Sequence, residues 1–156
     1  MDQHPHPQPA PHRRASDTVP AQRTPAPARE ERGAYDEAVR GLGPEPDAQL
    51  RIHRTATRLI AELRGEIDLE TALRIGPLLD AVTAGPRLAL IVDLRRVDFF
   101  DGSGVRLLAR IRSRVLEREG RLTVVCDRPL VLRVLRAARV LDVFRPVASL
   151  TEAIAT

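Results

Sequence analysis

VDFFDGSGVRLL, residues Val97–Leu108, joins a predicted buried strand to a predicted amphipathic helix. Ahead of it, Leu88–Leu94 (LALIVDL) is rich in branched apolar side chains and too short for a free-standing helix, which indicates a buried strand. Behind it, residues 104–119 carry apolar side chains at the spacing of one helical face: Val105, Leu108, Ile111 and Val115. The sequence therefore predicts a strand-to-helix junction at residues 101–103.

Ser103 is the residue of this junction that is best suited to chemistry. A side chain here lies beside free backbone N–H groups and the positive end of a helix dipole, so a hydroxyl can cap the helix or carry a phosphate. The local sequence alone favours a cap, with Asp101 as the other candidate for the same turn. Gly102 and Gly104 are interpreted as allowing a tight turn and a close backbone approach, and Gly102 is a candidate for positive φ.

The other apolar segments beyond residue 48 predict alternating strands and helices. Two short strands are expected around Leu50–Ile52 and over Thr57–Leu63, and Gly65 is expected to break the second. A helix is expected over Leu69–Val82, with Pro77 kinking or restarting it. The helical rhythm of that segment comes from its apolar residues: Leu69, Leu73, Leu78, Leu79 and Val82.

A further strand is predicted over Arg121–Cys126 and a further helix over Pro129–Val140, where Pro129 suits the first turn. Strands that alternate with helices predict an α/β sandwich. We expect a mixed β-sheet of four to five strands covered by about four helices. Cys126 is the single cysteine, which excludes an internal disulfide, and its apolar surroundings predict a buried, reduced thiol.

The chain divides by composition near residue 48. Residues 1–48 are rich in Pro and poor in large apolar side chains, so they predict a disordered arm with a possible short helix at Arg29–Leu42. Residues 49–156 are expected to form the folded domain. Neither a secretory signal nor a run of about 20 apolar residues is present, which predicts a cytoplasmic protein without a membrane span.

Several functional classes are not supported by the residues. All 25 basic residues are Arg, without the dense clusters or interleaved aromatic residues that track nucleic acid. DGSG differs from the GxSxG nucleophile elbow because Asp101 replaces its first Gly, and the predicted domain has one His, His53. A chain without Lys has no GxxxxGK[ST] phosphate loop, and no Cys/His spacing suits a metal. We therefore expect neither an enzyme nor a cofactor or metal site.

Two motifs together resemble the STAS domains, and among them the bacterial anti-sigma factor antagonists. The first is Gly65–Asp68 (GEID), followed by Thr71 and Ala72. The second is Asp93–Leu94 with Val97 and the run FFDGSG at residues 99–104, which resembles the family pattern DL..V.F.DSSG. The resemblance covers residues 49–156 and implies a STAS-type sandwich.

In the family pattern the serine immediately before the glycine is phosphorylated, and that serine falls on Ser103, whereas Gly102 replaces a usual Ser or Thr. The resemblance implies that the unmodified protein binds an anti-sigma factor that is also a serine kinase of the GHKL ATPase type, releasing a sigma factor. Phosphorylation ends the complex and a PP2C-type phosphatase restores it. The implied partner-binding residues are Asp68, Asp101, Gly102, Ser103, Gly104 and Arg106.

Two alternatives accompany this interpretation. The first is a STAS domain that is not phosphorylated and serves as a structural subunit of a lipid-transport or stressosome-like assembly. The second concerns an arginine stripe in which every fourth residue of the predicted helix is basic: Arg106, Arg110, Arg114 and Arg118. In so Arg-rich a chain we expect this stripe to be a solvated helix face, with a partner surface as the other interpretation.

Overall fold

The computed structural model describes residues 47–156, so the predictions for the N-terminal arm, including the helix at Arg29–Leu42, lie outside the described residues. The elements run in the order β1 (Leu50–Arg54), β2 (Leu59–Ile67), α2 (Leu69–Val82), β3 (Ala89–Phe100), α3 (Gly102–Glu117), β4 (Arg121–Val125), α4 (Pro129–Ala137), α5 (Leu141–Phe144) and α6 (Leu150–Ala155). Over this part of the chain, four strands and five helices form the predicted mixed α/β sandwich.

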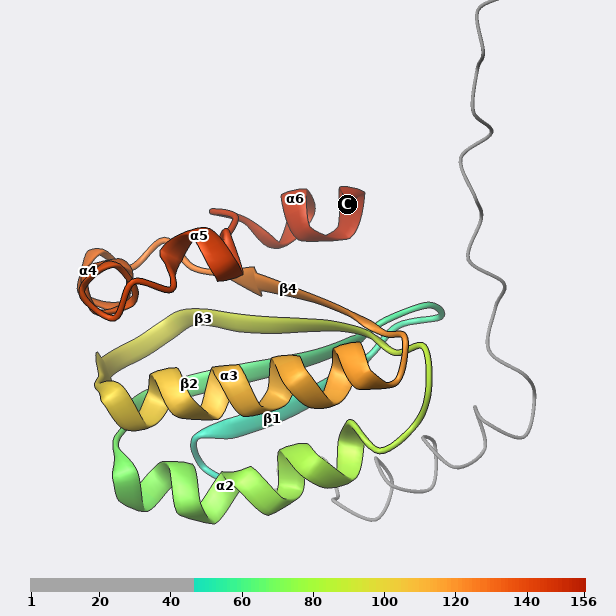
Figure 1. Cartoon of the computed structure of the whole chain (residues 1–156), viewed down its shortest axis with the longest axis horizontal. Helices are drawn as coiled ribbons and strands as arrows, with labels where there is room; N and C mark the ends of the chain where they lie inside the picture. Colours follow the sequence, from blue (N-terminus) through green and yellow to red (C-terminus); the bar gives the residue numbers. More distant parts are fainter. Residues whose placement is uncertain (1–46) are drawn as a thin grey trace, which may run out of the picture.

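The sheet has the strand order β1-β2-β3-β4. β1 pairs antiparallel with β2 as a hairpin, whereas β3 pairs parallel with both β2 and β4. The three parallel strands end at the same edge of the sheet, and α2, α3 and α4 begin there (Figure 1). Residues at the starts of these helices are therefore brought to one end of the domain.

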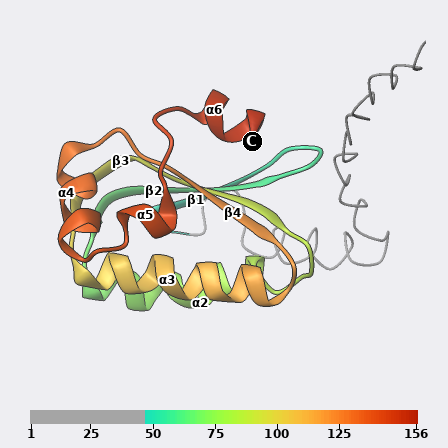
Figure 2. The same cartoon turned by 45° about the horizontal axis from the view of Figure 1, so that its top comes forward.

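The helices cover the two faces of the sheet unequally. α2 and α3 lie side by side on one face, and α6 lies on the other (Figure 2). The larger core, between the sheet and α2, α3, α4 and α5, is mainly aliphatic, with Phe100 and Phe144 as its aromatic members. The smaller core under α6 contains Ile60, Ile91, Val125 and Ala153. Alternate residues of the strands feed the two cores, as period-2 geometry requires.

Neither Gly65 nor Pro77 ends the element that contains it. Gly65 has φ of +65° but does not end β2, which continues to Ile67 through a shift of register against β3. Glycine adopts this backbone region without the steric cost that other residues incur, so the strand passes through it as an irregularity. α2 likewise runs unbroken through Pro77. The Leu73 carbonyl that loses its helical donor belongs to a residue on the exposed face, where water can satisfy it.

Two predicted boundaries also shift. β3 continues well beyond Leu94 to Phe100, because its later residues still pair with β2 and bury Val97 and Phe100 in the larger core. α4 ends at Ala137 rather than Val140.

Cys126 is buried and free, as predicted, and burial raises the pKa of its thiol.

The predicted arginine stripe on α3 is solvated at Arg106 and Arg110, whereas Arg114 and Arg118 are partly buried, and three of its four members bind the end of α2. Arg110 forms an ion pair with Asp80 of α2. The Arg114 guanidinium lies 3.3 Å from a carboxylate oxygen of Asp80 and donates to the Asp80 carbonyl at 3.1 Å. Arg118 donates from Nε to the Ala84 carbonyl at 2.9 Å. These cations meet the carbonyl-rich C-terminal end of α2, which carries partial negative charge.

Candidate functional site

Ser103 is the second residue of α3, and the cap of that helix is Asp101. The Asp101 carboxylate accepts a hydrogen bond from the Ser103 backbone N–H at 2.8 Å, so the expectation that the Ser103 hydroxyl is the cap is wrong. Both residue types are good caps, and the extended backbone of Asp101 decides between them. The Ser103 hydroxyl is left available for another role.

The Ser103 side chain is covered by Arg106. Ser103 is 7% exposed, and its Oγ accepts a hydrogen bond from Nη2 of Arg106 at 3.2 Å. Arg106 lies one helical turn further along α3, where side chains three residues apart are neighbours. The arrangement is a hydroxyl at a helix N-terminus with a guanidinium directly above it.

The two glycines of the motif have different reasons to be glycine. A Cβ on Gly104 would lie 2.5 Å from Cε2 of the buried Phe100 ring, so the close approach predicted for Gly104 is confirmed. A Cβ on Gly102 would meet only Nη1 of Arg106, at 3.7 Å, which is an ordinary contact. The proposal of positive φ at Gly102 is wrong, because Gly65 is the glycine with positive φ in residues 47–156.

Asp68 lies at the same end of the domain as Ser103, because the helices they begin follow the neighbouring strands β2 and β3 (Figure 1). Its carboxylate caps α2 by accepting from the Thr71 backbone N–H at 2.9 Å. This hydrogen bond lowers the pKa of Asp68. The GEID motif therefore starts α2 in the way that Asp101 starts α3.

Asp93, the first residue of the second motif, is a structural residue. It is 3% exposed on β3, and its carboxylate accepts from the Arg95 backbone N–H at 3.0 Å and from Nη2 of the Arg95 guanidinium at 2.8 Å. The hydrogen bonds to the Asp93 side chain raise the pKa of Arg95. Arg95 thus provides the buried carboxylate of Asp93 with a charged partner.

Exposed apolar side chains on β3, α2 and α4 form an apolar rim at the same end of the domain as the junction, and the sequence interpretation did not identify it. We use this name for four exposed side chains at the helix-start end of the sheet: Leu69 (56% exposed), Leu73 (69%), Phe99 (44%) and Leu130 (41%). Leu69 and Leu73 belong to the predicted helical rhythm of α2, but Ile75, Leu79 and Val82 provide its buried face. The spacing of Leu69 and Leu73 on a different helical face was the available signal.

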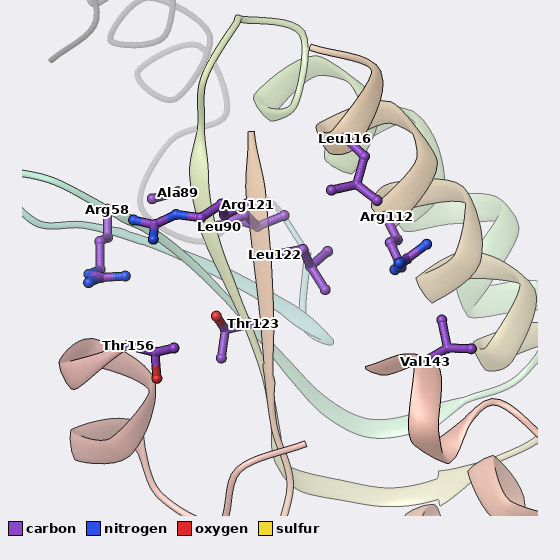
Figure 3. Close-up of a pocket in the computed structure, with 10 residues that line it drawn as sticks. All are labelled: Arg58, Ala89, Leu90, Arg112, Leu116, Arg121, Leu122, Thr123, Val143 and Thr156. Carbon is purple, nitrogen blue, oxygen red and sulfur yellow. The ribbon is translucent and has the colours of Figure 1, made fainter. Parts of the chain in front are cut away.

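A cavity of about 260 Å³ lies away from this junction (Figure 3). It is lined near the starts of β3 and β4 by Ala89 and Arg121, and by Arg112 and Leu116 of α3. Ser103 lies at the opposite end of β3, so the cavity is separate from the candidate site.

Among residues 47–156, no group of three His, Cys, Asp or Glu side chains could hold a metal ion, and no helix is long and apolar enough to cross a membrane.

The sequence model of the STAS domain matches residues 47–153, which include every strand and the whole Ser103 junction. The chain belongs to the STAS domain family. No curated protein matches its sequence.

Solved structures resemble this STAS domain. An anti-sigma factor antagonist from Mycobacterium paratuberculosis has 25% sequence identity and a TM-score of 0.61, over 68% of this chain and 90% of that one. The anti-sigma factor antagonist SpoIIAA in its unphosphorylated form has 23% identity and a TM-score of 0.58, over 67% and 92% of the two chains. SpoIIAA of Bacillus in its phosphorylated form has 21% identity and a TM-score of 0.55, over 68% and 96%. The STAS domain thus has anti-sigma factor antagonists as structural neighbours.

Proposed function

We propose that this STAS domain is an anti-sigma factor antagonist that is switched by phosphorylation of Ser103. The observation that carries the proposal is the Ser103 hydroxyl, held at the start of α3 without a capping role and next to the apolar rim. In the unphosphorylated form the protein binds an anti-sigma factor with GHKL-type serine kinase activity, and a sigma factor is released. The likeness to anti-sigma factor antagonists supports this partner class.

The docking surface in this proposal combines polar and apolar groups. Leu69, Leu73 and Phe99 of the apolar rim supply exposed apolar area, which drives association when it is buried. Charge around this area comes from Asp68, Asp101 and Arg106. Gly102 has no side chain, so it adds no bulk to the surface beside Ser103. Gly104 acts indirectly, by letting the first turn of α3 pack on Phe100. The proposed role is binding rather than catalysis by this chain.

Phosphorylation would end the complex by a change of charge and size. The kinase transfers the γ-phosphoryl group of ATP to Oγ of Ser103, ADP leaves, and the hydroxyl proton is released. The phosphate carries about −1.5 to −2 charges at neutral pH, and its burial against apolar groups would leave a desolvated anion. The fold tolerates it, since anions are favoured at helix N-termini. A PP2C-type phosphatase would hydrolyse the ester and restore binding.

Other parts of the proposal follow from this role. The protein works in the cytoplasm, where the sigma factor is, and it contacts neither nucleic acid nor a membrane directly. Because Ser103 is only 7% exposed, the kinase has to displace the Arg106 guanidinium before the hydroxyl can reach ATP. Docking and phosphoryl transfer are therefore separate events.

Binding of the cognate anti-sigma kinase to four proteins tests the proposal: wild type, Ser103→Ala, Ser103→Asp and the control Ser113→Ala on the same helix. We expect Ser103→Ala to bind in the presence of ATP and to remain bound, because it cannot accept phosphate. Ser103→Asp should fold at least as well as wild type, with a carboxylate at the helix start, yet bind poorly. Ser113→Ala should behave as wild type.

Two results together would refute the switch. They are wild-type affinity of Ser103→Asp for the kinase, and no phosphate on Ser103 after incubation with kinase and ATP. That combination would leave the structural-subunit interpretation of the STAS domain. Melting curves of all four proteins separate a loss of binding from a loss of folding.

A further inference from the structure

Arg106 differs from the other members of the arginine stripe in what it binds. Arg110, Arg114 and Arg118 contact a carboxylate or backbone carbonyls at the C-terminal end of α2. Arg106 instead donates to the neutral hydroxyl of Ser103, and within residues 47–156 it forms no ion pair. A guanidinium with five donors in a planar fork is poorly matched to one hydroxyl oxygen, since its strongest partners are carboxylate and phosphate.

The Arg106 guanidinium lies over the first turn of α3, close to both Gly102 and Ser103. A Cβ at position 102 would be 3.7 Å from Nη1 of Arg106, and Nη2 is the atom that donates to Ser103 Oγ at 3.2 Å. One terminal nitrogen of the guanidinium therefore contacts the hydroxyl, and the other lies beside the neighbouring residue, Gly102. A phosphate on Oγ would extend outward from the oxygen that Arg106 already touches.

We propose that Arg106 is the built-in counter-ion of phosphoserine at position 103, holding the phosphate against the helix start through a two-pronged guanidinium contact. This inference rests on the proposed function, because it assumes that Ser103 is the phosphorylated residue. Before phosphorylation the same guanidinium covers the hydroxyl. After phosphorylation it gains an anionic partner without any change of the backbone.

The contact has two measurable effects on the phosphorylated protein. A cation beside the phosphate favours its dianion, so the second pKa of the phosphoserine falls below its usual value of about 6. The folded state gains an interaction that the unfolded chain lacks, so phosphorylation raises the melting temperature. Other charges at this end of the sheet are Asp101, Asp68 and the surface pair Asp98–Arg128. Asp101 opposes the shift, and all of these remain when Arg106 alone is replaced.

The experiment installs phosphoserine at position 103 during translation, so it does not depend on any kinase. The second pKa of the phosphate is then measured by ³¹P NMR in wild type, Arg106→Gln, Arg106→Lys and Arg110→Gln, with melting curves for each protein and its unmodified counterpart. Arg110→Gln is the matched control, because it removes a cation of the same stripe one turn away, at Asp80.

We expect the wild-type phosphate to titrate roughly 0.5 to 1 pH unit below the phosphate of Arg106→Gln, with Arg106→Lys between them. Arg110→Gln should titrate like wild type, and the melting-temperature gain on phosphorylation should be smaller in Arg106→Gln than in wild type or Arg110→Gln, because only the contribution of the helix start remains. Equal pKa values in wild type and Arg106→Gln would overturn the inference, as would an equal shift in Arg110→Gln.

The inference and the proposed function fail in different measurements. If phosphoserine 103 has a lowered pKa but the phosphorylated protein still binds the anti-sigma kinase, the counter-ion is present and the switch is wrong. If binding is lost on phosphorylation while the pKa is the same in wild type and Arg106→Gln, the switch is present and the counter-ion is wrong.

Discussion

Replacement of Gly104 by Ala should destabilise the domain by overpacking its core beneath the candidate site. The added Cβ would lie 2.5 Å from Cε2 of Phe100 and 2.8 Å from both Cδ2 and Cζ, whereas carbon atoms pack best at about 3.5–4.0 Å. Phe100 is 2% exposed, so its ring cannot swing into solvent. Overpacking of this kind costs about 1–3 kcal/mol, and the better helix propensity of Ala returns up to about 1 kcal/mol. We expect a net loss of about 1–2 kcal/mol.

The loss can be measured by chemical denaturation of residues 1–156, with thermal melting beside it. For a domain of this size, each kcal/mol lowers the melting temperature by about 4 °C. Gly102→Ala is the matched control, because its Cβ meets only Nη1 of Arg106, at 3.7 Å, in the same turn of α3. It should be as stable as wild type or slightly more stable.

A second substitution tests the cause. Phe100→Leu should cost less stability in the Gly104→Ala background than in wild type, because the smaller side chain relieves the contact that the new Cβ creates. If Gly104→Ala were as stable as Gly102→Ala, or if Phe100→Leu were equally costly in both backgrounds, the close approach would not be the reason for glycine at position 104.

Three further predictions concern stability and reactivity. Asp101→Ala should cost about 1 kcal/mol in denaturant unfolding, as a lost cap, whereas Ser103→Ala should change stability by less than about 0.5 kcal/mol, because its hydroxyl caps nothing. The Arg74 guanidinium lowers the pKa of Asp47, so this pair stabilises the fold above the unfolded pKa, and the stability difference between wild type and Asp47→Asn should narrow as the pH falls below about 4. Cys126 is buried with a raised thiol pKa, so mass spectrometry should find it unmodified by iodoacetamide until denaturant unfolds the domain.

Elements whose pattern spans a whole face could be predicted from the sequence. The apolar run before the junction and the helical spacing after it located β3 and α3, and their order with the flanking elements predicted the mixed sandwich. The end of β3 was missed because the run of apolar residues stops at Leu94, while the strand continues with one face exposed. A continuous run of apolar residues identifies only the part of β3 that is buried on both faces.

Details that depend on a partner from another element could not be predicted. Asp101 and Ser103 are equivalent candidates in sequence, and only backbone geometry shows which one caps α3. The contacts of the arginine stripe with α2 could not be predicted, because its main anionic partner, Asp80, is on a different helix. The exposure of Leu69 and Leu73 could not be predicted, because a helical rhythm does not reveal which of two apolar faces the sheet covers.

The contacts of the arginine stripe divide the α2–α3 pair into a fastened end and an open end. Arg110, Arg114 and Arg118 join the later turns of α3 to the end of α2. The capping carboxylates of the first turns, Asp68 and Asp101, each accept a hydrogen bond from their own helix. The two helices are therefore cross-linked by side chains near the end of α2, and Ser103 lies at the other end of the pair. Backbone amide exchange should accordingly be slow where the arginine stripe joins the helices and faster toward their first turns. A partner could then shift these first turns without unfolding the core.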